Sequence, residues 1–373
     1  MTWFQNLPLL YIVIPSAVIL TVAYFVYGRI LSRLFELDPN RKTPAVTVVI
    51  PAYNSAHYIA QALDSLKAQT FNDFEVIVVN DGSADRDELE RILKSHPLPV
   101  IYVSQENKGV SAARNAAIRI AKGEFYAQLD ADDQWTPDYL EVQLRILSDN
   151  PDAAVVYPNA TIIHDGSDAT LEFMKISPSE GEVSFTSMVR QQCVIMTCVT
   201  ARMSAIRGAG MFDESLRSCE DFDLWLRIVR DGGRIVYHER PLVLYRRHEG
   251  SLSSDRVWMT RNILAVFEKC AANFELTAAE KEILDEQIGS NRAMLNLFEG
   301  KHQLSAGQTS AALVSFENAN AHLRTPKLGL VIFLLRYAPR LVGWGFSMRE
   351  RLLARQADHQ LSGIDQPRAS SSV

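Results

Sequence analysis

Residues 46–54, VTVVIPAYN, form a nearly continuous run of apolar and β-branched side chains that ends in turn residues. Such a run is typical of a strand buried on both faces of a parallel sheet. A second run of this kind, FEVIVVNDGS at residues 74–83, also ends in a turn, and a segment with helical spacing lies between the two. This alternation predicts an α/β domain in which helices cover a mainly parallel sheet.

Residues 123–133, GEFYAQLDADD, bring three carboxylates to the end of another short apolar run, at Asp130, Asp132 and Asp133. Carboxylates this close repel one another unless a cation neutralises them, which points to Mg²⁺ or Mn²⁺ with oxygen ligands. The alternative is a solvated acidic turn before a helix that Pro137 would open. These residues alone do not decide between the two interpretations.

Polar residues also end the two preceding strands, at Asn54 and Asp81. Ligands of open α/β sheets bind beyond the carboxyl ends of the strands, so we expect Asn54, Asp81 and the acids of 130–133 to face one site.

Two further charged positions have both a functional and a structural interpretation. Arg114 lies on a helix rich in small residues and could reach a phosphate or a base, or it could simply be solvated. Glu220 and Asp221 open an apolar helix, where the helix dipole favours anions, so they could be catalytic or could cap the helix.

Composition limits the class of protein. The chain has 373 residues, enough for one sizeable domain with extensions, and a formal net charge of -6, which gives no reason to expect a nucleic-acid partner. Its four cysteines match no common zinc spacing, and we interpret them as ordinary small residues of a reduced, cytosolic domain.

The N-terminal segment predicts a membrane anchor. Residues 1–28 contain no Asp, Glu, Lys or Arg, and Leu7–Tyr27 is long enough to cross a bilayer at about 1.5 Å per residue. Residues 29–44 form a basic linker, so the positive-inside rule predicts a single span with the N-terminus outside and everything after residue 28 in the cytoplasm. A buried core helix is the alternative, and a cleaved signal peptide is disfavoured because no basic residue precedes the run.

Six segments occur in an order and at intervals that resemble a family 2 glycosyltransferase with the GT-A nucleotide-sugar-binding fold. They are VTVVIPAYN, VVNDGS, NKGVSAARN, GEFYAQLDADD, SCEDFDLWLR and YRRHEGSLS. The resemblance implies a GT-A domain over residues 45–255. It also implies inverting transfer of a sugar from a nucleotide diphosphate, expected to be UDP, to an acceptor hydroxyl.

The resemblance assigns roles to individual residues. Asp221 would be the general base, with Glu220 orienting it. A Mn²⁺ or Mg²⁺ ion would be held by Asp132 and His248, with help from Asp130, and Arg247 would contact the diphosphate. The residues expected to bind the donor nucleotide are Pro51, Tyr53, Asn54, Asp81, Arg114 and Asp130.

The C-terminal third extends beyond this domain. Residues 256–325 have a helical pattern, and their small residues and Phe316 have the spacing of one tetratricopeptide-like hairpin. Residues 326–356 predict an amphipathic helix lying on an anionic membrane surface, with a buried helix as the alternative. Residues 357–373 are polar and predict a disordered tail.

An anchored transferase suggests a lipid-linked glycan or glycolipid acceptor in surface polysaccharide assembly. One alternative is a non-catalytic nucleotide-sugar-binding scaffold or sensor, which would not need Asp221. A nucleotidyltransferase should have a glycine-rich phosphate loop after Pro51, and the sequence AYNSAHY lacks one. A processive synthase would need several membrane spans. The sequence does not indicate an oligomeric state.

Overall fold

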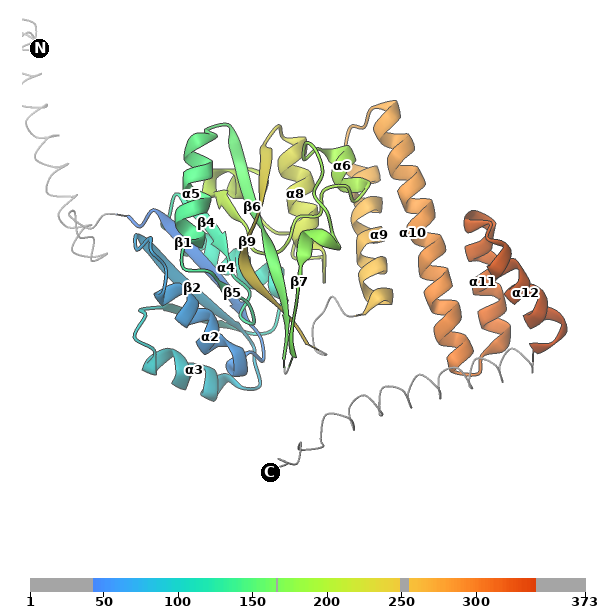
Figure 1. The fold of residues 1–373 in the computed structure, drawn as a ribbon, viewed down its shortest axis with the longest axis horizontal. Coiled ribbons are helices and arrows are strands. Elements are labelled where there is room, and N and C mark those ends of the chain that lie inside the picture. Colours follow the sequence, from blue (N-terminus) through green and yellow to red (C-terminus); the bar gives the residue numbers. More distant parts are fainter. Residues whose placement is uncertain (1–42, 166, 249–254, 340–373) are drawn as a thin grey trace, which may run out of the picture. The chain divides into compact units, whose positions relative to one another are not determined.

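The structure is a computed structural model that describes residues 43–165, 167–248 and 255–339 (Figure 1). The predicted membrane span, most of the basic linker, and the C-terminal half of the predicted interfacial helix with its tail lie outside these residues. From Ala45 onward, the described residues belong to one unit built on a nine-stranded sheet.

The first half of the sheet is parallel, as predicted. Its strands are β1 (Val46–Ala52), β2 (Phe74–Asp81), β3 (Ile101–Gln105) and β4 (Phe125–Gln128), in the spatial order β3-β2-β1-β4. Successive residues of β1 alternate between two buried clusters: Val48 and Ile50 pack on one face of the sheet, and Val49 packs on the other. Burial on both faces explains why these strands are continuous apolar runs.

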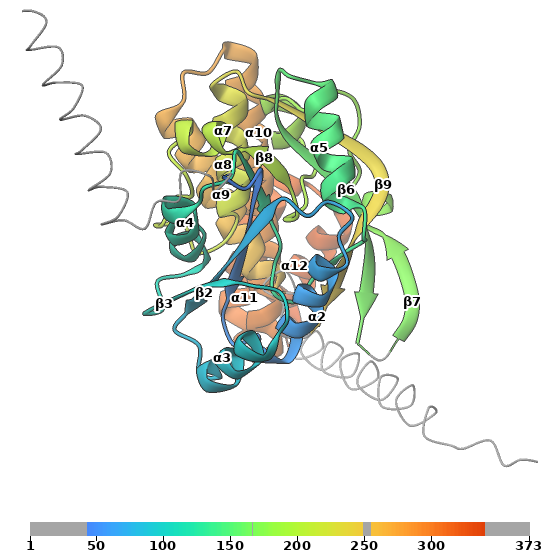
Figure 2. The same ribbon diagram turned by 90° about the vertical axis from the view of Figure 1, so that its left-hand side faces the viewer.

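Helices cover both faces (Figures 1 and 2). The first face carries α2 (Ala56–Lys67), α3 (Arg86–Ser95) and α5 (Tyr139–Asp149). The second carries α4 (Val110–Ile120), α6 (Phe185–Val189), α7 (Met203–Gly208) and α8 (Glu220–Arg230). The buried side chains Ile59 and Leu63 of α2 and Trp225 of α8 belong to these two cores, so each helix buries its apolar face.

The second half of the sheet mixes strand directions. Strand β8 (Thr200–Arg202) runs antiparallel to β4 and to β6 (Ala153–His164). Strand β9 (Arg234–Arg247) runs parallel to β6, and β5 (Gln134–Trp135) pairs antiparallel with β9. The fold is therefore a mixed α/β fold of the GT-A type, with the carboxyl ends of β1, β2 and β4 at one edge.

Two local features differ from what the sequence pattern indicates. Residues 165–179 are polar and rich in turn residues, a pattern that does not predict a strand, yet they contain β7 (Ser167–Glu172), because the edge of β6 supplies hydrogen-bonding partners that a polar sequence does not reveal. The helix expected from Pro137 begins at Tyr139, because Asp138 has a non-helical φ of -105° and takes the N-cap position.

The C-terminal helices are α9 (Arg256–Asn273), α10 (Ala278–Ser305), α11 (Thr309–Leu323) and α12 (Pro326–Tyr337). Helix α9 contributes Phe267 and Cys270 to the main core, whereas α10, α11 and α12 share a small core of their own. A Cβ at Gly300 would lie 2.7 Å from the Phe316 ring, so this glycine permits the close packing of α10 on α11.

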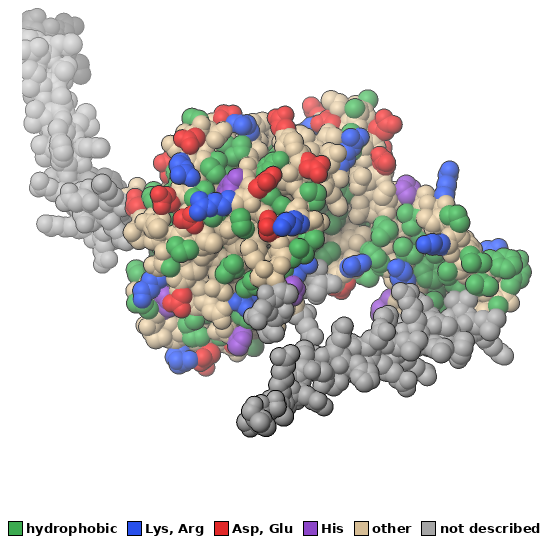
Figure 3. All heavy atoms as spheres, viewed as in Figure 1, with side chains coloured by type: hydrophobic (Ala, Val, Ile, Leu, Met, Phe, Trp, Pro, Cys, Tyr) green, Lys and Arg blue, Asp and Glu red, His purple; other side chains and the backbone are tan. Residues whose placement is uncertain are grey.

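Helix α12 leaves apolar side chains exposed on one face. Leu330, Phe333 and Tyr337 are 59%, 56% and 70% exposed, and Figure 3 shows hydrophobic side chains gathered over α11 and α12. Among the described residues, no helix is both long and apolar enough to span a bilayer. The predicted anchor, Leu7–Tyr27, lies outside those residues.

The approach of the turn before β4 to β1 gives a stability prediction. A Cβ at Gly123 would lie 2.4 Å from the Thr47 amide nitrogen, which is fixed in the sheet. We expect Gly123→Ala to lower the free energy of unfolding by about 2 kcal/mol, because backbone has to move. A Cβ at Gly208 meets no atom within 4 Å, so Gly208→Ala is the control and should change stability by less than about 0.5 kcal/mol in urea denaturation.

Candidate active site

The edge where the parallel strands end is hollowed into a cavity of about 620 Å³. All residues to which the family resemblance assigns a role line it, except Arg247. Those that line it are Pro51, Tyr53, Asn54, Asp81, Arg114, Asp130, Asp132, Glu220, Asp221 and His248. The guanidinium of Arg247 instead lies 5.9 Å from the centre of the Tyr245 ring.

The ends of β1 and β2 form one end of the cavity. Asn54 has a positive φ of 49°, and its side-chain Oδ1 accepts a hydrogen bond from the Ala84 backbone amide (2.8 Å). The backbone amide of Asn54 donates to Ser83 Oγ (3.1 Å). Asn54 therefore locks the two strand ends together. Tyr53 is 55% exposed and Pro51 is partly exposed, so both can present a flat surface to a planar ring.

Asp81 organises the loop before α4. Its Oδ1 accepts hydrogen bonds from Gln105 Nε2 (2.7 Å) and the Lys108 amide (2.9 Å), and its Oδ2 accepts one from the Gly109 amide (2.8 Å). The carboxylate is buried but lines the cavity. Asp81 thus positions this loop, and the remaining lone pairs of its oxygens can face a ligand N–H.

Arg114 lies between two acids at the centre of the site. Its side chain is only 3% exposed, its Nη2 donates to Asp130 Oδ1 (2.9 Å), and its Nη1 donates to Glu220 Oε1. Burial alone would lower the pKa of the guanidinium, but the two carboxylates raise it, so Arg114 stays charged. The primary role visible here is to join the loop after β4 to helix α8, and the expected nucleotide contact remains a prediction.

The first turn of α8 gives its two acids different environments. Glu220 is buried and paired with Arg114, while Asp221 Oδ1 accepts a hydrogen bond from the Phe222 amide (2.7 Å). Burial and the neighbouring Glu220 carboxylate raise the pKa of Asp221 to about 7, although Arg114 opposes this shift. Asp221 can therefore take up a proton near neutral pH.

The acids after β4 also differ in their contacts. Asp132 Oδ2 lies 3.2 Å from His248 Nε2, and burial together with the nearby Asp130 raises the pKa of Asp132. Asp133 is buried and accepts hydrogen bonds from the Arg246 amide (2.9 Å) and Cys198 Sγ (3.7 Å). Asp133 thus anchors the end of β9 and neither lines the cavity nor caps α5.

Asp132 and His248 fit a divalent cation. A carboxylate and an imidazole meet beside a second carboxylate, Asp130, and a cation would relieve the repulsion that raises the pKa of Asp132. Within the described ranges, no three His, Cys, Asp or Glu side chains form a complete metal site. Mg²⁺ and similar ions commonly bind through one or two protein ligands plus substrate phosphates. Two protein ligands are therefore enough for such an ion.

Side chains that the sequence did not single out contact Asp132 and His248, the candidate cation ligands. Arg246 Nε donates to the Asp132 carbonyl (3.0 Å), and its guanidinium pairs with Asp165 and lies 5.0 Å from the centre of the Tyr58 ring. The Tyr58 ring stacks on His248 at 5.3 Å. Neither Tyr58 nor Asp165 belongs to one of the six family segments. They reach the site only because α2 and the β6–β7 turn meet there.

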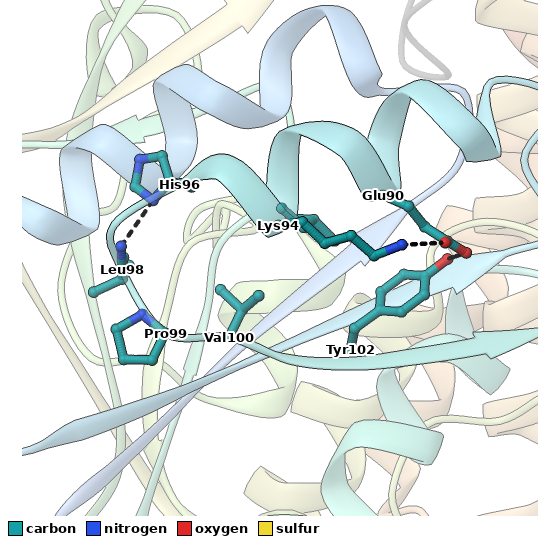
Figure 4. Close-up of a pocket in the computed structure, with 8 residues that line it drawn as sticks. Glu90, Lys94, His96, Leu98, Pro99, Val100 and Tyr102 are labelled. Atoms are coloured by element: carbon teal, nitrogen blue, oxygen red, sulfur yellow. Dashed lines mark hydrogen bonds and ion pairs between the residues drawn. The ribbon is translucent and has the colours of Figure 1, made fainter.

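A second, smaller cavity of about 320 Å³ lies between α3 and β3, remote from these residues (Figure 4). Its charged groups are already paired: Glu90 accepts hydrogen bonds from Lys94 and from the Tyr102 hydroxyl. None of the residues predicted to carry chemistry lines it. The larger cavity is therefore the candidate active site.

Sequence comparison links the chain to known proteins. Residues 47–207 match the family model described as glycosyl transferase family 2. An uncharacterized glycosyltransferase of Rickettsia typhi is 32% identical, over 66% of this chain and 77% of that protein. Glycosyltransferase GlyA of Streptococcus pneumoniae is 27% identical, over 73% of this chain and 40% of that protein.

Solved structures share the fold at low sequence identity. Residues 1–349 of TarS from S. aureus, in complex with UDP-GlcNAc, align with a TM-score of 0.55 and 20% identity, over 83% of this chain and 92% of that one. The mannosyltransferase PcManGT from Pyrobaculum calidifontis, in complex with GDP-Man and Mn²⁺, aligns with a TM-score of 0.54 and 20% identity, over 91% of this chain and 96% of that one.

The buried position of Arg114 gives a stability prediction. Arg114→Met leaves the Glu220 and Asp130 carboxylates without their cation, and we expect the free energy of unfolding to fall by about 3 kcal/mol. Adding Glu220→Gln should recover part of the loss, since it removes one uncompensated charge. Arg86→Met, which breaks an exposed pair with Glu90, is the control and should leave the denaturation midpoint unchanged. Equal effects of Arg86→Met and Arg114→Met would contradict the bridging role.

Proposed function

The chain belongs to glycosyl transferase family 2, and from this membership we propose that it transfers a sugar from a nucleoside diphosphate to an acceptor hydroxyl with inversion of the anomeric carbon. The observation that carries the proposal is the pair of acids at the start of α8, of which Glu220 is paired with Arg114 and Asp221 has a raised pKa, in a cavity that also holds the Asp132–His248 pair. Direct displacement needs one general base and no protein nucleophile, and Asp221 supplies that base.

Asp221 would take the proton of the acceptor hydroxyl as its oxygen attacks the anomeric carbon from the face opposite the diphosphate. Its raised pKa, about 7, makes the carboxylate basic enough for this task near neutral pH. Arg114 holds the Glu220 side chain in place, and after burial the Glu220 carboxylate is the next largest contribution to the raised pKa of Asp221. Glu220 is therefore a positioning and tuning residue.

The donor would lie across the cavity, with its base against Pro51 and Tyr53 and its diphosphate near Asp132 and His248. Mn²⁺ or Mg²⁺ held by these two residues, with Asp130 beside them, would act as a Lewis acid that stabilises the departing diphosphate. We propose UDP as the nucleotide. TarS was solved with UDP-GlcNAc and PcManGT with GDP-Man, so nucleoside diphosphate sugars are the donor class in structures of this fold.

We further propose that the enzyme works at the cytoplasmic face of a membrane, on a lipid-linked glycan or glycolipid acceptor. The uncharged, apolar sequence of residues 1–28 supports an anchor. At the other end, the exposed side chains Leu330, Phe333, Leu334 and Tyr337 share one face of α12 at helical spacing. Lys327 precedes them and Arg340 follows in the sequence, which suits an anionic lipid surface.

The role of Asp221 can be tested by substitution. We expect Asp221→Asn to reduce sugar transfer by about 10³-fold, because the amide cannot accept the proton, and to leave UDP affinity within about twofold. Asp231→Asn, at the exposed C-terminal end of the same helix, is the matched control and should keep full activity. Product formation by HPLC and UDP binding by calorimetry give the two readouts. Transfer by Asp221→Asn at the wild-type rate would refute the assignment.

The pH dependence of the reaction follows from the raised pKa of Asp221. Below a pH of about 7 this carboxylate is protonated and cannot act as a base, so kcat/KM should fall about tenfold per pH unit. Above that pH the rate should level off. Initial rates between pH 5 and pH 9 measure the profile, and a rate that stays constant down to pH 5 would contradict Asp221 as the base.

A further inference from the structure

Helix α9 lies outside the segment that matches the family model, yet its first turn lines the catalytic cavity. Trp258 and Met259 of this turn line the same cavity as Asp221. We propose that Trp258 is the platform on which the acceptor binds, and that the group it recognises is a neutral pyranose ring. This inference rests on the proposed function, because it identifies the acceptor side of that same site.

The first turn of α9 is fixed relative to the catalytic acids. Helix α9 runs beside α8 in both views (Figures 1 and 2). Met259 Sδ lies 3.7 Å from Ser218 Oγ, just before α8, and the rings of Phe222 and Phe267 pack edge to face at 5.9 Å. Farther along, Lys269 Nζ lies 2.7 Å from the buried carboxylate of Asp223. These contacts fix the first turn of α9, which carries Trp258, against the segment where α8 begins with Glu220 and Asp221.

The position of Trp258 suits the acceptor better than the donor. The donor's base and diphosphate are accounted for by the ends of β1 and β2 and by the Asp132–His248 pair. A base that deprotonates the attacking hydroxyl must face the acceptor, so residues beside Asp221 and away from that pair surround the acceptor. Trp258 and Met259 reach the cavity from α9, which supplies none of the donor residues.

One wall of the cavity is lined by Thr197, Ser218, Trp258 and Met259, and its chemistry fits a sugar ring. An indole offers a large, flat, rigid apolar surface for the C–H face of a pyranose. Among the described residues, neither Trp258 Nε1 nor Thr197 Oγ1 has a hydrogen-bond partner, although both are shielded from solvent. Two polar atoms in need of partners therefore lie in residues that line the cavity.

The same wall does not fit an anionic acceptor group. Thr197, Ser218, Trp258 and Met259 carry no charge. Arg217, a cation that precedes Ser218, extends toward the loop held by Asp81, where the nucleotide is proposed to bind. Its Nη1 lies 3.8 Å from where a Cβ at Gly109 would be. Among the described residues that line the cavity, Thr197, Ser218, Trp258 and Met259 would thus offer the phosphate of a lipid monophosphate no counter-charge, whereas a neutral saccharide needs none.

Binding of simple sugars to the full chain tests the inference. The probes are methyl glucopyranosides, galactopyranosides and N-acetylglucosaminides, with farnesyl phosphate as the lipid alternative, and saturation-transfer NMR with UDP and Mg²⁺ present measures their binding. We expect at least one glycoside to bind the wild type, Trp258→Ala to weaken its binding at least about tenfold, and Trp258→Phe to keep most of the affinity. Ile120→Ala, which shortens an exposed side chain at the end of α4, is the control and should bind as the wild type does.

UDP titration of the same variants separates the possible failures. Trp258→Ala should bind UDP with wild-type affinity, which also shows that it is folded. Equal loss of UDP and glycoside would overturn the acceptor assignment, as would a Trp258→Ala variant with unchanged glycoside affinity. Binding of farnesyl phosphate without any glycoside would overturn the sugar class. If the wild type binds glycosides but no nucleoside diphosphate, the proposed function fails and the inference falls with it.

Discussion

The site depends on one buried interaction, the guanidinium of Arg114 held between Glu220 and Asp130. These residues come from α4, from α8 and from the loop after β4, and each acid is far from Arg114 in sequence. The bridge fixes where α8 begins relative to Asp130 and Asp132, the acids after β4 that line the cavity. A buried cation with two acids is costly unless every charge is paired, so the three elements have little freedom to move apart.

Around this bridge, neighbouring carboxylates acquire different properties from their surroundings. Glu220 is paired, and next to it Asp221 has its pKa raised to about 7. Asp132 faces His248, whereas Asp133, one residue later, turns inward to bind the backbone of β9. The sequence DADD therefore combines a carboxylate that lines the cavity with a structural anchor, because adjacent residues after a strand point in different directions.

The sequence predicted the parallel half of the sheet and the cavity at its carboxyl edge, because continuous apolar runs and terminal polar residues are local signals. It did not predict strand β7, whose pairing with β6 is decided by the fold. The bridging role of Arg114, the stacking of Tyr58 on His248 and the reach of Trp258 into the cavity were equally hidden. Each depends on elements distant in the chain, which no single motif contains.

The central claim is that one cavity binds a nucleoside diphosphate through a divalent cation at Asp132 and His248. Calorimetric titration of UDP and of GDP, with Mn²⁺ and then with EDTA, tests it most directly, using the wild type and Asp132→Ala. We predict that one nucleotide binds with Mn²⁺ and that its affinity falls by about tenfold or more both in EDTA and in the variant. Equal affinity under all of these conditions, or no binding of either nucleotide, would contradict the account.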